Sequence, residues 1–244
     1  MQLNVAHWTE QEYEALLQEL QNIADEKYRQ FQQKIVPGLN QLYGVRMPKL
    51  QEMAQEIANG NWQEFLSIAE GKHDVYEATL LEGLVIGKAG MPLPELLVKV
   101  RRFVSKIDNW AVNDSFCAAL KQTSSAKAEF LPMIQDYLHS RKEYEVRFGL
   151  IMLLDYYMSN EELPMLFSVC DAVNHTGYYV KMAVAWLLSI CFVTDERATI
   201  QYLKKCQLDD WTYQKTLQKI RESKRVSAIS KERLKKLKRT NALK

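Results

Sequence analysis

Residues 144–157 read YEVRFGLIMLLDYY, the clearest of several apolar segments that decide the fold. Apolar side chains recur in it at steps of three and four residues, which places them on one face of an α-helix. The same spacing occurs in EYEALLQEL (12–20), PKLQEMAQEIA (48–58), PELLVKVRRFV (94–104) and YYVKMAVAWLLSICF (178–192). Because no alternating segment has a hairpin turn beside it, the sequence predicts an all-α protein.

A longer period lies beneath these helices. Five segments start 34 residues apart, at Tyr76, Trp110, Tyr144, Tyr178 and Thr212. Each is preceded by another predicted helix. Proline suits the first turn of a helix, where its missing N–H is not needed. We expect three of the preceding helices to start near a proline: Pro94, Pro132 and Pro164. A repeating unit of two helices predicts a solenoid.

The repeat length equals that of tetratricopeptide repeats, but their signature tryptophan, glycine and alanine positions are absent. HEAT-like helical hairpins fit better, since they constrain the sequence mainly through apolar periodicity. We therefore expect residues 1–244 to form a single domain, an all-α superhelical solenoid of HEAT-like hairpins. The part before about Pro48 keeps the repeat poorly.

The charge of the chain is unevenly distributed. The net charge is +2 over 244 residues, yet nine Lys or Arg and one Glu lie between Lys224 and Lys244. Residues 224–244 are expected to form a basic C-terminal helix or tail within the domain. Such a segment is either a solvated terminal helix, the simpler interpretation, or an arm that contacts a polyanion.

Several classes of protein are disfavoured. The four cysteines form no CxxC pair, and three lie in apolar helical segments, so we expect buried free thiols in a reducing, cytoplasmic compartment. The start of the chain lacks a signal-peptide pattern, and the longest apolar segment is too short to span a membrane. No P-loop, Rossmann glycine pattern or nucleophile elbow is present, and the histidines are scattered. We expect no metal and no cofactor.

The repeat register brings out a candidate site. Counted from the aromatic start of each repeat, four residues fall at registers zero, four, three and eight of their helices: Trp110, Asp114, Arg147 and Trp186. These registers share one broad helical stripe, and corresponding stripes align along one wall of a solenoid. We therefore expect the four side chains to converge on one surface. Lys181 and Lys215 repeat the cationic position of Arg147 along that wall.

Simpler interpretations exist for each residue. Asp114 and Arg147 could form a structural ion pair between adjacent repeats, the tryptophans could be packing residues, and the cations could be a solvated face. Their alignment on one stripe favours a groove instead. Cations at repeat spacing together with aromatic rings suit a phosphate backbone with its sugars and bases.

On NWAVNDSFC (109–117), YEVRFGLIMLLDYY and YYVKMAVAWLLS (178–189), the chain resembles the bacterial DNA alkylation repair family, the HEAT-like-repeat alkylpurine DNA glycosylases. The likeness extends from LYGVRMPKL (42–50) to TYQKTLQKIRESKRVS (212–227). It implies a superhelix whose basic concave face binds duplex DNA, and excision of purines alkylated at N3 or N7. It also implies that Trp110, Asp114, Arg147 and Trp186 are the catalytic residues.

The protein is expected to be a monomer that binds double-stranded DNA carrying alkylated purines. Contacts to the DNA are expected at Arg147, Lys181, Lys215, Lys224 and Arg225. Tyr28 is a candidate for a further contact near the N-terminus. The chemistry suits Asp114, because a carboxylate stabilises an oxocarbenium-like sugar and orients water toward it. Two other functions stay open: a DNA-binding repeat protein that does not cleave, and a protein-interaction scaffold.

Overall fold

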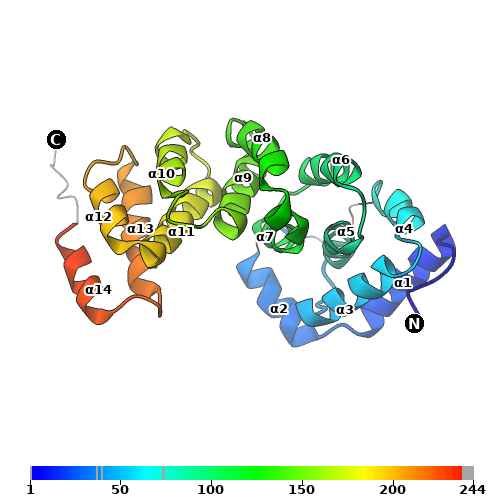
Figure 1. The fold of residues 1–244 in the computed structure, drawn as a ribbon. Helices are drawn as coiled ribbons and strands as arrows, with labels where there is room; N and C mark the ends of the chain where they lie inside the picture. Colours follow the sequence, from blue (N-terminus) through cyan, green and yellow to red (C-terminus); the bar gives the residue numbers. More distant parts are fainter. Residues whose placement is uncertain (1, 37, 40, 73–74, 238–244) are drawn as a thin grey trace. The chain divides into compact units, whose positions relative to one another are not determined.

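The computed structural model describes residues 2–36, 38–39, 41–72 and 75–237. The chain divides into two compact units, Met1–Ala126 and Lys127–Lys244. In the described ranges every regular element is a helix and none is a strand, as Figure 1 shows. The all-α prediction is therefore confirmed.

The first unit contains seven α-helices and a short 3-10 helix in its described residues. They are α1 (Glu10–Asn22), α2 (Glu26–Ile35), α3 (Met47–Ala58), α4 (Trp62–Ala69), α5 (Tyr76–Lys88), α6 (Leu93–Val104), α7 (Trp110–Ala119) and η1 (Lys121–Ser125).

Helix α5 is the centre of this unit. It packs against α3 on one side and α7 on the other, while α4 and α6 also lie against it. Ten of its 13 residues are buried, so its sequence is apolar nearly all round rather than amphipathic. Gly83 and Gly87 let neighbours approach closely: a Cβ on Gly87 would lie 2.6 Å from the Cβ of Ala119 in α7. These glycines fix how near α7 sits to α5.

Two carboxylates on α5 are buried, and each has its own partners. Glu77 accepts hydrogen bonds from the backbone N–H groups of Tyr43, Gly44 and Val45, which holds the segment leading into α3. Gly44 has φ +102°, a conformation that favours glycine, and its Cβ position is blocked by the Asp25 carbonyl at 2.6 Å. A buried polar group that keeps three backbone donors satisfied is a structural anchor.

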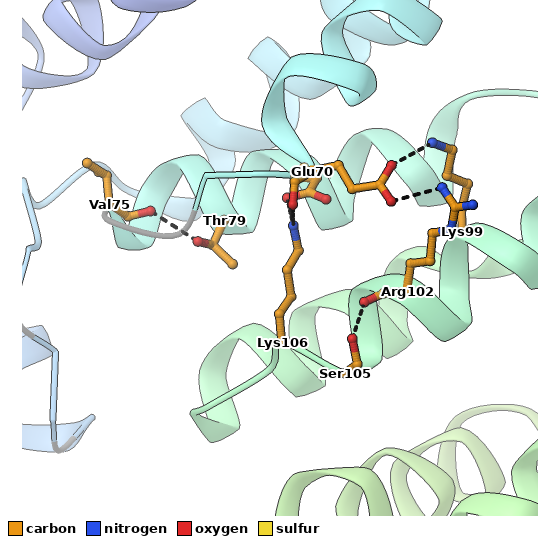
Figure 2. A network of polar contacts seen from close by, with 8 residues as sticks. Glu70, Val75, Thr79, Lys99, Arg102, Ser105 and Lys106 are labelled. Atoms are coloured by element: carbon orange, nitrogen blue, oxygen red, sulfur yellow. Dashed lines mark hydrogen bonds and ion pairs between the residues drawn. The ribbon is translucent and has the colours of Figure 1, made fainter.

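Glu82 belongs to a polar network that ties α4, α5 and α6 together. Lys106 forms an ion pair with Glu82 at 2.5 Å, and its ammonium also donates to the Glu70 carbonyl at 3.3 Å. The Glu70 carboxylate is held by Lys99 at 3.2 Å and Arg102 at 2.9 Å, as Figure 2 shows. Burial raises the pKa of Glu82, although the Lys106 ammonium opposes that shift.

The second unit continues with further α-helices, seven in its described residues. They are α8 (Lys127–Leu138), α9 (Glu143–Tyr156), α10 (Leu163–Ala172), α11 (Tyr178–Thr194), α12 (Glu196–Leu203), α13 (Asp210–Glu222) and α14 (Ala228–Lys235).

Alternate helices of this unit pack side by side. Helix α11 lies between α9 and α13, while α8 packs on α9 and both α10 and α12 pack on α11. This arrangement is the one expected of helical hairpin repeats, as Figure 1 shows within the unit. Nine of the 17 residues of α11 are buried, because neighbouring helices cover it on both sides.

The 34-residue period matches the helix starts closely. Helices α5, α7 and α11 begin at Tyr76, Trp110 and Tyr178, whereas α9 begins one residue before Tyr144 and α13 two residues before Thr212. Pro94 and Pro164 are second residues of their helices, as predicted.

The prediction for Pro132 was wrong, because this proline lies inside α8, five residues after its start. The helix begins earlier because the preceding residues, KAEFL, include good helix formers. The proline removes only the hydrogen bond to the Ala128 carbonyl, one turn from the beginning of the helix.

The end of the described chain packs against the second unit. Leu234 of α14 is fully buried, and the hydroxyl groups of Ser230 and Tyr213 donate to Glu196 and to the Leu237 carbonyl. Residues 238–244 of the predicted basic tail lie outside the described residues. All four cysteines are free and buried, as expected. None of the described helices combines the length and apolar character needed to span a membrane.

Candidate functional site

The site in the first unit is built on the first two turns of α7. Asn109 caps the helix, because its side-chain oxygen accepts from the Val112 N–H at 2.9 Å. Trp110 follows as the first helical residue and is half-buried. Its indole N–H donates to the Ile35 carbonyl at the end of α2, at 3.1 Å. The capped start and this contact fix the ring of Trp110 at one end of the helix.

Asp114 lies one turn further along α7 and is also half-buried. The side-chain amide of Asn113, itself fully buried, donates to one Asp114 carboxylate oxygen at 3.0 Å. The amide oxygen of Asn113 finds no hydrogen-bond partner in the described part of the chain. A flipped amide would instead face a carboxylate with its oxygen, so Asp114 determines the orientation of Asn113.

Asp114 borders a pocket of about 530 Å³ between α3, α5 and α7. The polar side chains that line it are Gln51, Gln55, Lys88, Asp114, Ser115 and Lys121. The Lys88 ammonium donates to Gln55 across the pocket at 3.3 Å. A carboxylate beside a solvent-accessible pocket with two cations on its lining is suited to meet a ligand.

The second unit carries the other predicted helical residues on three alternate helices, α9, α11 and α13. Arg147 of α9 is only 5% exposed, and its guanidinium donates to the Tyr179 carbonyl in the first turn of α11 at 2.9 Å. The sequence predicted this arginine on an open wall, and that prediction was wrong, because the structure buries the side chain. The structure adds a backbone partner, because a guanidinium carries five donors and buried donors require acceptors.

Lys181 and Lys215 occupy the same register on α11 and α13. The ammonium of Lys181 pairs with Asp209 at 3.3 Å, and that of Lys215 donates to Gln218 at 2.8 Å. Burial raises the pKa of Asp209, but hydrogen bonds from Thr212 and the Lys181 ammonium hold it below its usual range. Lys181 is thus partly neutralised, whereas Lys215 is bound to a neutral amide.

Lys219 is a cation that the sequence analysis did not single out. It lies one turn after Lys215 on α13 and is half-buried. Burial lowers the pKa of its ammonium, and the nearby charges of Lys215 and Arg147 lower it further. Register seven lies on the same stripe as registers zero, three, four and eight, so the repeat alignment contained the signal.

Trp186 lies in the middle of α11 and is half-buried, like Trp110. Neither ring is enclosed in the core, which distinguishes both from the fully buried Phe116 and Phe148. Trp110 and Asp114 belong to the first unit, whereas Arg147 and Trp186 belong to the second. The convergence of all four on one surface stays a prediction.

The remaining predicted contacts lie at opposite ends of the chain. Lys224 and Arg225 are exposed in the turn between α13 and α14. Tyr28 of α2 is half-buried, with the Arg46 guanidinium 4.9 Å from its ring centroid and the Phe31 ring stacked at 6.4 Å. Among the described residues, no group of His, Cys, Asp and Glu side chains could hold a metal ion.

Comparison with known proteins gives one informative result. No curated protein matches the sequence. The family model described as "DNA alkylation repair enzyme" matches residues 16–244, a range that includes every predicted site residue of both units. Since the match covers nearly the whole sequence, the chain belongs to the DNA alkylation repair enzyme family.

Proposed function

We propose that the protein is a DNA glycosylase that hydrolyses the N-glycosidic bond of N3- or N7-alkylated purines in duplex DNA. The observation that carries the proposal is the position of Asp114 on the lining of a pocket, one helical turn from a half-buried tryptophan. The family match supports the coarser role in DNA alkylation repair.

The chemistry requires little acid catalysis. Alkylation at N3 or N7 makes the purine cationic, so the base leaves with the electron pair of the C1′–N9 bond and becomes neutral. The sugar that remains has oxocarbenium character. The Asp114 carboxylate stabilises this cation and orients a water molecule, whose oxygen forms the new bond to C1′ and whose proton passes to the solvent.

The amide of Asn113 contributes by holding the carboxylate. It donates to one oxygen of Asp114, the carboxylate that lines the pocket. The ring of Trp110, held by its hydrogen bond to the Ile35 carbonyl, offers a face to the deoxyribose. Attraction between that face and the sugar grows as the sugar becomes cationic.

In this proposal the second unit contacts the phosphate backbone of the DNA. Lys181 and Lys215 lie on adjacent helices, with Lys219 close to Lys215. Arg147 is buried on α9 near Lys219, and only the family resemblance assigns it to a phosphate. Cations at repeat spacing suit successive phosphates of one strand. Trp186, half-buried on α11, is assigned to the sugar together with Trp110. That both units contact one duplex is part of the proposal, and it is supported by the repeat register and by the family resemblance.

The decisive experiment is Asp114→Asn. This substitution keeps the size of the side chain and removes its charge, so release of N7-methylguanine from duplex DNA should fall by about 10²–10⁴-fold in a single-turnover assay. Affinity for duplex DNA should stay the same or rise, because a negative charge near phosphates is lost. Normal excision by a fully folded variant would disprove the catalytic assignment.

The same variant separates the alternative roles. If Asp114 serves only as a counter-charge to Arg147, Asp114→Asn should lower the melting temperature, and excision should fall only with the folded fraction. A DNA-binding protein without catalysis would bind duplex and release no base from the wild type. A protein-interaction scaffold would show no salt-dependent affinity for DNA.

A further inference from the structure

Four aromatic side chains of the second unit form a continuous row at the beginnings of α9, α11 and α13. Tyr144 lies 5.5 Å from Tyr179, measured between ring centroids, and Tyr179 lies 5.1 Å from Tyr178. Tyr178 in turn meets Trp211 edge to face at 5.6 Å. We call this row, Tyr144, Tyr179, Tyr178 and Trp211, the aromatic ladder.

The far end of the ladder is open to solvent. Tyr178 is 55% exposed and Trp211 is 39% exposed, which places both among the few large apolar side chains of the described residues that face water. Single exposed apolar residues are ordinary, but neighbouring exposed rings mark a binding surface. Each ring contacts the next, so the four rings form one connected surface.

Cations adjoin the open rings. The Lys215 ammonium lies 5.5 Å from the Trp211 ring centroid, and Lys181 follows Tyr178 by three residues on the same helix. Both lysines are at the register that the proposed function assigns to phosphates. Rings beside cations therefore line one edge of the unit, an arrangement that matches alternating bases and phosphates of a nucleic acid strand.

The carboxylates on this edge already bind donors. Glu143 accepts the Tyr179 N–H at 2.5 Å, and Asp209 accepts from the Trp211 and Thr212 backbone while pairing with Lys181. Asp210 begins α13 beside them. Hydrogen bonding to backbone N–H groups offsets part of the negative charge of Glu143 and Asp209, so these two carboxylates oppose an incoming phosphate less strongly.

We propose that the aromatic ladder is a stacking surface for unpaired bases of DNA, with Lys181 and Lys215 holding the adjoining phosphates. The inference rests on the proposed function only in taking DNA as the ligand, and it assigns nothing to Asp114. Unpaired bases are the fitting ligand because stacking needs base faces, which neighbouring base pairs cover in an intact duplex. Every base has such a face, so the surface tolerates any sequence.

The test compares two DNA probes of equal length. One is a perfect duplex, and the other carries a three-nucleotide bulge that contains 2-aminopurine. The wild type should bind the bulged probe more tightly, with a change in 2-aminopurine fluorescence as its base stacks. Trp211→Ala and Tyr178→Ala should each reduce the ratio of the two affinities by roughly 5- to 150-fold, the worth of one stacked base. Neither should weaken binding to the perfect duplex.

Two control variants sharpen the result. Trp211→Phe keeps a ring and should retain most of the preference for the bulge. Ile229→Ala removes another exposed apolar side chain of the same unit, 69% exposed on α14, and should change nothing. Melting curves of all variants establish that each is folded before its affinities are compared.

Contrary outcomes are equally clear. Equal wild-type affinities for the two probes would overturn the inference, and so would an equal loss for both probes in Trp211→Ala. Sedimentation that shows altered self-association of Trp211→Ala with an unchanged affinity ratio would assign the ladder to contacts between copies. Excision of N7-methylguanine without any bulge preference rejects the ladder alone, whereas bulge preference without excision rejects the glycosylase alone.

Discussion

The buried amide of Asn113 positions Asp114, and its removal tests whether orientation matters to the proposed reaction. Asn113→Leu keeps a similar volume but deletes the donor to the Asp114 carboxylate. It also removes an amide oxygen without a hydrogen-bond partner among the described residues. An apolar side chain of similar shape costs little stability there. We expect an unchanged melting temperature and at least about a tenfold slower excision. Wild-type excision rates would contradict a positioning role.

The two half-buried tryptophans, Trp110 and Trp186, give a second prediction about single residues. Because Trp110 and Trp186 are partly exposed, truncation to alanine should cost less than the roughly 3–5 kcal/mol typical of a core aromatic. Excision should nevertheless fall clearly in both variants. Phe116→Ala is the matched control, because Phe116 lies on α7 and is only 1% exposed. Chemical denaturation of the three variants gives the comparison. Equal losses of stability would show that the tryptophans are packing residues of the core.

At the scale of elements, the packing of α7 on α5 depends on Gly87. A methyl group there would meet Ala119 at 2.6 Å, backbone and side chain alike, so α7 must shift. We expect Gly87→Ala to destabilise the fold by about 1–3 kcal/mol, as overpacking does, and to slow excision by moving Asp114. Gly90→Ala is the control, because a Cβ there meets no atom within 4 Å. Urea unfolding of both variants decides, and equal stabilities would refute the close-contact argument.

The ion pair between Glu82 of α5 and Lys106, which follows α6, predicts that the stability of the fold depends on pH. Burial raises the pKa of Glu82 above its ordinary value of 4.5, so the folded state keeps this proton to higher pH than the unfolded state. Stability from this group is therefore greatest at low pH and falls as pH rises through the window that begins near 4.5. The slope is at most about 1.4 kcal/mol per pH unit.

Glu82→Gln removes this titration. The difference in unfolding free energy between wild type and variant should therefore decline from pH 4.5 upward and then level off. Unfolding curves measured between about pH 4 and 8 give this difference. A difference that rises with pH would mean that the Lys106 ammonium outweighs burial and lowers the Glu82 pKa instead.

For the whole molecule, the proposal requires largely electrostatic binding to duplex DNA. Affinity should fall linearly on a logarithmic salt scale, with a slope near −0.9 for each phosphate neutralised. The exposed Lys224 and Arg225 are the clean test, since neutralising both to alanine should reduce the slope by up to about 1.8. Deleting residues 224–244 would also remove α14, whose Leu234 is buried, and would confuse charge with packing. An unchanged slope would show that Lys224 and Arg225 do not contact the DNA.

The sequence by itself determined the helical repeat and the family. A helix start depends on local signals, so the 34-residue step from Tyr76 to Thr212 located five helices to within two residues. Register is local as well, which is why Trp110 and Asp114 were correctly placed one turn apart on a single helix. At Pro132 one local signal outweighed another, because the helix-forming residues before the proline start α8 five residues earlier.

Only the tertiary structure decided the surroundings of each side chain. The burial of Arg147 against the Tyr179 carbonyl, the burial of Asn113 and the docking of α14 through Leu234 all depend on what packs nearby. Tyr178 and Trp211 are 33 residues apart, yet their rings meet because α11 packs against α13. Periodicity fixes which face of a helix a residue occupies, but burial and partners depend on the neighbouring helices that cover that face.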